Sequence, residues 1–240
     1  RNAAGVNTGI QFVLAQYNPA GELMDEPGIN RVTVEEVTEG TPPDKYHRFL
    51  SQNNAIWPHE KYLNIWLMSE TKYPKFWNSI TKLCVPKYRL GSETLPGLSL
   101  PPVPSTWVPK VEQIGILFRM STFQYFQRSI DATAERELVT CIGNYLGLLD
   151  TWKINNSNVN DQCNDTFAYG IVNNNGSLGT NSSWSKEVGS YRFLSENIMD
   201  DPTGTHRSVS KDQALRMYWV LKNCAGRSMW QSDFALTGKE

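Results

Sequence analysis

Short runs of alternating apolar and polar residues occupy the first half of the chain and predict β-strands. The clearest run covers residues 62–68, where aromatic and aliphatic side chains alternate with polar ones. Runs rich in apolar or β-branched residues predict further strands at residues 10–15, 31–34 and 114–118. A pair of prolines precedes residues 44–53, which we expect to form a helix. The first half of the chain is therefore expected to supply a sheet and one short helix.

A different apolar spacing predicts a long helix within residues 132–152. Five apolar residues recur there at helical intervals and form one stripe, namely Leu138, Ile142, Tyr145, Leu146 and Leu149. Thr140 and Asn144 fall on a separate, polar face of the same helix. Gly147 lies near the end, where a helix can turn sharply.

Loops and one more helix are predicted in the remaining segments. Residues 85–109 are rich in proline, which predicts a long irregular loop. Residues 153–190 are also loop-rich, with several Asn, Ser and Gly residues. Ser210, followed three residues later by Gln213, has the pattern of a capping box and predicts a last helix that continues to Leu221.

The composition is that of an ordinary globular protein, with 240 residues of which 40% are hydrophobic and 20% are charged. This length allows one large domain, or two small subdomains around a cleft. The formal net charge of -1 gives no electrostatic basis for binding nucleic acid. No apolar run approaches the roughly 20 residues of a membrane helix, so no transmembrane segment is expected.

The cysteines do not have the spacing of a metal site. Cys84, Cys141, Cys163 and Cys224 include no C-x-x-C pair, which argues against structural zinc. Cys163 and Cys224 could form one disulfide, although four cysteines allow three connectivities. Cys141 falls on the inner side of the predicted central helix and is expected to be a buried thiol.

Two further features of the composition each have two interpretations. Four N-x-[ST] sequons begin at Asn155, Asn164, Asn175 and Asn181, and they equally match the polar composition of a loop. Eight Trp and ten Tyr residues either pack in the core or form a surface that grips peptide or sugar.

A family resemblance emerges at the end of the predicted central helix. Residues 143–152 read Gly-Asn-Tyr-Leu-Gly-Leu-Leu-Asp-Thr-Trp. They resemble the zinc helix of the pappalysin-type (cytophagalysin- or ulilysin-like) metzincin metalloproteases, whose pattern is H-E-x-G-H-Y-L-G-L-x-H-T-[FW]. Four other landmarks of that family occur along this chain in the family's order. They are a first strand at residues 9–15, a G-I-x-R turn at 28–31, a Y-L-N-I-W strand at 62–66 and a Met-turn at 197–200.

The resemblance implies an α+β fold of the metzincin (zincin-like) type. We expect a mixed twisted sheet, a long helix equivalent to the active-site helix, and an irregular C-terminal subdomain with a Met-turn and a final helix. Residues 1–147 would form the N-terminal subdomain and residues 148–240 the C-terminal subdomain, together one catalytic-type domain. Gly143, Gly147 and Met199 are expected to be packing positions that keep the two halves docked.

The residues that hold zinc in this family are altered. Active relatives use two histidines four residues apart, a third ligand after the glycine bend, and a glutamate that activates the bound water. The equivalent positions here are Thr140, Cys141, Asn144 and Asp150. Thr140 and Asn144 are poor zinc ligands, and Cys141 cannot replace the glutamate as general base. Asp150 alone would be tolerated, but the whole set predicts no zinc site and no catalytic residue.

Three residues near the expected Met-turn bear on other site chemistry. Asp201 stands where the family often has a tyrosine that supports the reaction intermediate. His206 is the least implausible replacement ligand, but a lone loop histidine is expected to lie at the surface. Calcium, which some relatives bind, could be held by Asp200 and Asp201.

We therefore expect a catalytically inactive protease homologue, a pseudoprotease, that binds peptide or protein in its cleft or gives structural support. In active relatives the substrate lies extended along an edge strand. Three alternatives stay open: an active zinc peptidase with atypical ligands, a cysteine hydrolase using Cys141, and a Trp/Tyr-rich module that binds carbohydrate or protein. The resemblance also implies an extracytoplasmic bacterial protein, secreted or anchored as a lipoprotein, with a signal segment preceding this sequence.

Overall fold

The computed structural model describes residues 5–32, 50–68, 114–119, 133–154, 159–171, 185–188, 190–201, 204–223, 227 and 229. Its strands are short and form pairs. β1 (Ile65–Met68) lies parallel to β2 (Ile116–Arg119), and β3 (Trp152–Ile154) lies parallel to β4 (Tyr169–Ile171). β5 (Ser185–Val188) and β6 (Tyr191–Leu194) form an antiparallel hairpin.

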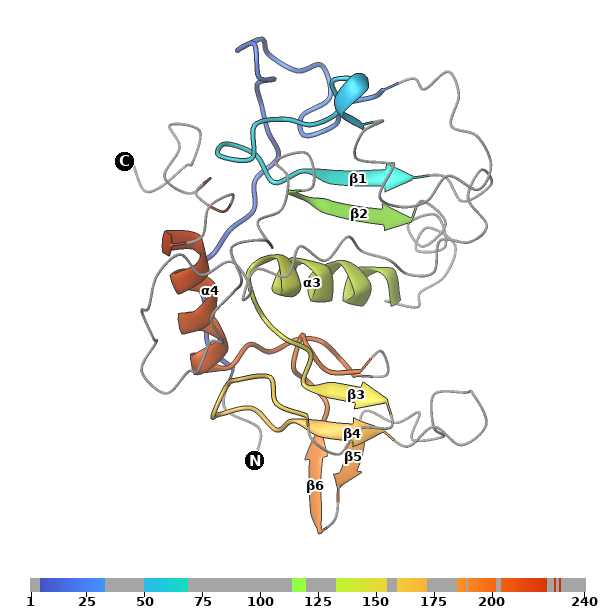
Figure 1. The fold of residues 1–240 in the computed structure, drawn as a ribbon, viewed down its shortest axis with the longest axis vertical. Coiled ribbons are helices and arrows are strands. Elements are labelled where there is room, and N and C mark those ends of the chain that lie inside the picture. The colour runs from blue at the N-terminus through green and yellow to red at the C-terminus, as the bar shows by residue number, and fades with distance from the viewer. Residues whose placement is uncertain are drawn as a thin grey trace.

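Two helices organise these pairs. α3 (Thr133–Tyr145) lies between the β1–β2 pair and the β3–β4 pair, and α4 (Lys211–Asn223) stands beside the end of α3 from which the chain leaves for β3 (Figure 1). Most of the apolar core is contributed by α3, β2, α4 and the loop between β6 and α4. The core residues are Ile114, Ile116, Cys141, Tyr145, Leu146, Leu148, Ile198, Met199, Met217 and Leu221.

The start of α4 has the reciprocal hydrogen bonds of a capping box. The Ser210 backbone N–H donates to Gln213 Oε1 over 3.0 Å, and the Gln213 N–H donates to Ser210 Oγ over 3.2 Å. Asp165 Oδ2 accepts the Asp212 N–H over 2.9 Å, so a carboxylate also lies against the positive end of the helix dipole. The capping box predicted from the sequence is confirmed.

The C-terminal end of α3 is held by two buried arginines. Arg216 Nε–H donates to the Gly147 carbonyl over 2.6 Å, and Arg227 Nε–H donates to the Tyr145 carbonyl over 2.8 Å. The Arg227 guanidinium also lies 3.7 Å from the centre of the Tyr145 ring. Burial raises the pKa of Tyr145 to about 12 despite the opposing charge of Arg227. Two cations therefore satisfy carbonyls at the negative end of the helix.

Gly147 makes the turn after α3 at a φ of 94°, a region that side chains disfavour. A Cβ atom there would lie 2.5 Å from Val220 Cγ2 on α4. We expect Gly147→Ala to lower the free energy of unfolding by about 2–4 kcal/mol, through backbone strain and overpacking together.

Urea unfolding would measure this loss, and Gly21→Ala is the matched control. Gly21 has a similar φ of 83° but no atom within 4 Å of the added Cβ, so it isolates the backbone strain. That control is expected to lose only about 1 kcal/mol. Equal losses in the two variants would show that the contact between Gly147 and Val220 is not tight.

The strands predicted at residues 62–68 and 114–118 are confirmed over most of their length by β1 and β2. The strand predicted at residues 10–15 is wrong. The Ala15 carbonyl accepts the Gly28 N–H over 2.7 Å and the Gln16 carbonyl accepts the Met24 N–H over 2.9 Å, so this backbone is committed to a loop rather than to a ladder.

Other predicted elements are shifted or fall partly outside the described residues. Residues 31–32 are not in a strand, and residues 33–34 and the predicted loop 85–109 lie outside the described part. Of the helix predicted at residues 44–53, only residues 50–53 are described, and 50–52 are helical. The region 153–190 was expected to be loop-rich, yet it contains β4 and β5. No helix within the described ranges is both long and apolar enough to span a bilayer.

Candidate functional site

Thr140, on the polar face of α3, contacts the loop that precedes α4. Its hydroxyl donates to the Ile198 carbonyl over 2.8 Å, and its oxygen lies 3.3 Å from His206 Nδ1. His206 Nε2–H donates to the Asp201 carbonyl over 2.9 Å. His206 has a positive φ of 51° and only 9% of its surface is exposed. The expectation of a surface histidine is therefore wrong, because both ring nitrogens are engaged inside the protein.

Asn144 lies one turn further along the same face and contacts Asp150. Its side-chain N–H groups donate to Asp150 Oδ1 over 3.2 Å and face the Leu148 carbonyl at 3.5 Å. Asn144 is buried, whereas Thr140 and Asp150 are partly exposed. The structure thus gathers the three positions that the resemblance equates with zinc ligands, and it links two of them by a direct hydrogen bond.

A tight turn at residues 197–200 lies beneath these positions. Met199 is fully buried, and its sulfur lies 3.9 Å from Asn144 Nδ2. A Cβ added to Gly143 would lie 2.6 Å from the Met199 sulfur, so only glycine allows this approach of helix and turn. The Thr151 N–H donates to the Met199 carbonyl over 3.1 Å, which joins the turn to the segment leading into β3.

The side chains at this position do not fit zinc. Zinc in proteins takes imidazole nitrogen, thiolate sulfur or carboxylate oxygen. Asn144 directs N–H donors towards Asp150, and a donor cannot coordinate a cation. The Thr140 hydroxyl is committed to a backbone carbonyl. Within the described ranges, no group of three or more His, Cys, Asp or Glu side chains is arranged to hold a metal ion.

Cys141 points away from this face. It is 1% exposed and belongs to the apolar core, so the prediction of a buried thiol is confirmed. Cys163 is also a buried free thiol, and burial among Asp161 and other carboxylates raises its pKa. The suggested disulfide from Cys163 to Cys224 is therefore wrong in this structure, and Cys224 itself lies outside the described residues.

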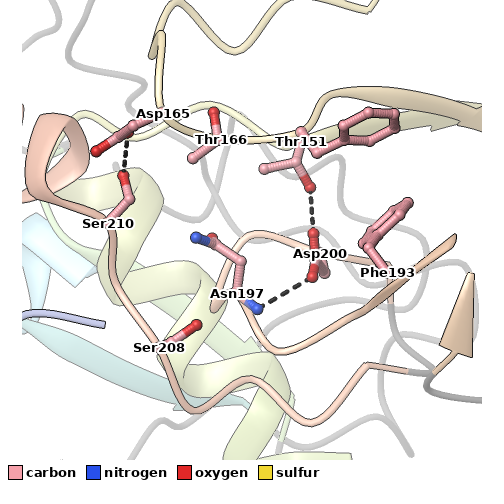
Figure 2. A pocket seen from close by; sticks show the side chains of 9 residues that line it. Thr151, Asp165, Thr166, Phe193, Asn197, Asp200, Ser208 and Ser210 are labelled. Carbon is pink, nitrogen blue, oxygen red and sulfur yellow. Dashed lines mark hydrogen bonds between the residues drawn. The ribbon is translucent and has the colours of Figure 1, made fainter. Parts of the chain in front are cut away.

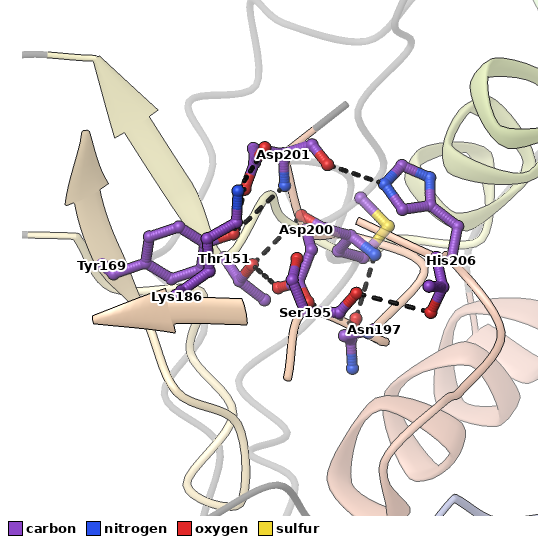
Figure 3. A network of polar contacts seen from close by, with 10 residues as sticks. Thr151, Tyr169, Lys186, Ser195, Asn197, Asp200, Asp201 and His206 are labelled. Atoms are coloured by element: carbon purple, nitrogen blue, oxygen red, sulfur yellow. Dashed lines mark hydrogen bonds and ion pairs between the residues drawn. The ribbon is translucent and has the colours of Figure 1, made fainter. Parts of the chain in front are cut away.

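A buried ion pair extends the polar network beyond His206 (Figure 3). Lys186 Nζ lies 2.9 Å from Asp201 Oδ2, and both side chains are at most 5% exposed. The Tyr169 hydroxyl donates to Asp201 Oδ2 over 2.7 Å. Burial, followed by the nearby carboxylates of Asp200 and Asp201, raises the pKa of Tyr169, which keeps the phenol a neutral donor. The network therefore joins α3, β4, β5 and the 195–206 loop.

Asp200 is a second buried carboxylate in the turn. Its Oδ1 accepts the Thr151 hydroxyl over 2.6 Å, and its Oδ2 accepts the Asn197 N–H over 3.0 Å. Burial raises the pKa of Asp200 although these hydrogen bonds act in the opposite direction. Both oxygens are thus used to brace the turn rather than directed to a ligand.

A small hollow opens beside this turn (Figure 2). It is lined by Thr151, Asp165, Thr166, Phe167, Phe193, Asn197, Asp200, Ser208 and Ser210. The hydroxyl of Ser210 donates to Asp165 over 2.6 Å, and that of Thr166 donates to Asp161 over 2.6 Å. These hydroxyls of the lining therefore donate to carboxylates within the protein, as expected for a hollow that has a structural role.

The sequence pointed to Thr140, Asn144 and Asp150 as a set, but it missed Lys186 and Tyr169. Both lie in the region 153–190, for which the sequence predicts mainly loops, and no motif singles them out. The sequence singles out Asp201 as a departure from the family and as a possible calcium ligand, whereas the structure shows it as the acceptor of the buried ion pair.

Comparison with known proteins supports the fold. The sequence matches no protein-family model and no curated protein. The structure is similar to that of mature mirolysin from Tannerella forsythia, solved in complex with a cleaved peptide, with a TM-score of 0.56 and 19% sequence identity. The alignment covers 94% of this chain and 76% of the mirolysin chain. The chain therefore has a metalloprotease-like fold.

Proposed function

We propose that this protein is a pseudoprotease of the pappalysin-type metzincin class, which binds peptide or protein and does not hydrolyse it. One observation carries the proposal: at two of the positions that the resemblance equates with zinc ligands, the amide of Asn144 donates a hydrogen bond to Asp150 over 3.2 Å. A direct bond between two ligand positions replaces the ion that would join them. The substituted residues Asn144 and Asp150 therefore hydrogen-bond to each other, and they do not form a metal site that lacks only one ligand.

The same geometry argues against catalysis by other groups. A hydrolase needs an activated water or nucleophile and a base within reach of it. Cys141 takes the place of the catalytic glutamate and is buried in the core, so it can neither activate water nor meet a substrate. His206 Nε2–H donates to the Asp201 carbonyl and its Nδ1 lies 3.3 Å from the Thr140 oxygen, so the ring braces the loop.

A binding role is supported by what the scaffold retains. The packing of Gly143 on Met199 and the buried network around Asp201 keep helix and loop in a fixed relation, although no reaction requires it. Mirolysin, which has a similar fold, was captured with a cleaved peptide. We infer that this chain holds an extended peptide on the corresponding surface by backbone hydrogen bonds.

Several further expectations belong to this proposal. They are the subdomains at residues 1–147 and 148–240, the identity of residues 197–200 as a Met-turn, and an extracytoplasmic location. No cofactor is proposed. A calcium ion at Asp200 and Asp201 is not favoured, because both carboxylates accept internal hydrogen bonds.

Metal content tests the proposal directly. The protein is dialysed against zinc, stripped of loosely bound metal and analysed by mass spectrometry. We expect less than about a tenth of a zinc ion per chain, because no described set of side chains suits zinc.

The contrary result is equally specific. About one zinc per chain, lost in Asp150→Ala or His206→Ala, would identify an active-type site with atypical ligands. Cleavage of a protein substrate that a chelator abolishes would then replace the binding proposal by a peptidase.

A further inference from the structure

A second surface, far along the chain from the candidate site, presents apolar side chains to solvent. It is formed by residues 10–32, here called the N-terminal platform, drawn in blue in Figure 1. Six large apolar residues of the platform are between 47% and 70% exposed, namely Phe12, Val13, Leu14, Tyr17, Leu23 and Ile29. A group of large apolar side chains exposed together marks an interaction surface, whereas single exposed apolar residues are normal.

The platform is ordered by its own hydrogen bonds. Tyr17 and Leu23 form an isolated antiparallel bridge, and the Gly28 N–H donates to the Ala15 carbonyl over 2.7 Å. Gly28 has a φ of 75°, and its Cα packs so closely on Leu14 that a Cβ would lie 2.8 Å from that side chain. The Tyr62 hydroxyl donates to the Tyr17 carbonyl over 3.0 Å and ties the platform to the segment before β1. The apolar side chains are therefore displayed on a fixed frame.

The charges of the platform limit what it can bind. Its charged residues are Glu22, Asp25, Glu26 and Arg31, all exposed, which gives a net charge of −2. Arg31 is bonded to Glu26 over 2.5 Å, so Glu22 and Asp25 dominate the rim. A second copy of the platform would place like charges together, and an anionic membrane would repel them.

We propose that the N-terminal platform docks an extended segment of a partner protein that is apolar at its centre and basic at its ends. Residues 11–14 belong to no helix, strand or turn, so a partner strand can add along them while its apolar side chains cover Leu14 and Leu23. This surface does not involve α3, and the proposal is independent of the proposed function.

The test uses two synthetic peptides with the same alternating Val-Thr centre, one flanked by Lys and the other by Glu. Fluorescence anisotropy at low salt is expected to show about tenfold tighter binding of the Lys-flanked peptide, and added salt should narrow this gap. Leu14→Ser/Leu23→Ser should weaken binding about tenfold or more, since both side chains are exposed and can be changed without disturbing the core. Tyr191→Ser, at an equally exposed residue of β6, is the matched control and should bind as the parent protein does.

Several outcomes would overturn the proposal. These are equal binding of the two peptides, binding of neither, or binding unaffected by Leu14→Ser/Leu23→Ser. Ultracentrifugation that shows a dimer dispersed by the same variant would assign the platform to a second copy. Binding to phosphatidylcholine vesicles, lost in that variant, would assign it to a membrane. Asp150→Ala should leave peptide binding here unchanged, which separates this surface from the α3 site.

Discussion

Thr140→His/Asn144→His is expected to bind about one zinc ion per chain, whereas the parent protein binds almost none. Positions 140 and 144 are one helical turn apart on the same face of α3. Asn144 already reaches Asp150 over 3.2 Å, so an imidazole at 144 would point towards that carboxylate. His206 Nδ1 lies 3.3 Å from the Thr140 oxygen and can supply a further nitrogen. Two or three imidazoles and one carboxylate form a ligand set that suits zinc, and isothermal titration with metal analysis would detect it.

Two controls make the zinc result specific. Adding Asp150→Ala should weaken zinc binding by about tenfold or more, because the carboxylate is one of the ligands. Leu215→His/Lys222→His adds the same number of histidines on exposed positions of α4, about two turns apart, and should not bind zinc as a chelate. A folded double variant that takes up no zinc would show that the helix positions do not converge, and the metzincin interpretation of α3 would fail.

The reconstituted site should still be inactive. Position 141 is a cysteine in the apolar core, 1% exposed, so no general base stands beside the restored ligands. Zinc uptake without cleavage of a protein substrate is the expected pair of results. It would support the proposal that this scaffold can be made to hold zinc but has no base that uses it.

Local signals explain which parts of the fold could be predicted. The capping box at Ser210 and Gln213 involves residues three apart, and the strand pattern at β1 is contained within a few residues. The segment 10–15 has a strand-like composition too, but a strand also needs a partner. Its neighbouring carbonyls, at Ala15 and Gln16, bond to Gly28 and Met24 instead. Composition alone cannot reveal whether this segment pairs with another strand or bonds within a loop.

The candidate site was predictable as a set of positions but not as a set of contacts. The spacing of Thr140, Asn144 and Asp150 on and after one helix is a local property. The contact of Thr140 with His206 joins residues 66 apart, and that of Tyr169 with Asp201 joins residues 32 apart. Such pairs depend on how the 195–206 loop packs under α3, which no short motif encodes. This is why His206 was misassigned to the surface and Lys186 was missed.

Lys186→Met is expected to lower the free energy of unfolding by about 3–5 kcal/mol, the cost of leaving a buried charge without its partner. Lys186 and Asp201 are 5% and 2% exposed, and their charged atoms lie 2.9 Å apart. After the substitution Asp201 would keep the neutral Tyr169 hydroxyl at 2.7 Å but lose the ammonium group. A hydrogen bond from a phenol does not replace the charge, so the carboxylate must ionise at a high cost or take up a proton. Urea unfolding at neutral pH would measure the loss.

A double variant that removes both charges of the pair gives the decisive comparison. Lys186→Met/Asp201→Leu removes both charges, so it should be more stable than Lys186→Met alone, and the difference measures the coupling of the pair. Lys222→Met, at an exposed position of α4, is the matched control and should change stability by less than about 0.5 kcal/mol. If Lys186→Met costs no more than this control, the pair does not form in solution. The loop that carries Asp201 and His206 would then be held to β4 and β5 by hydrogen bonds and packing alone.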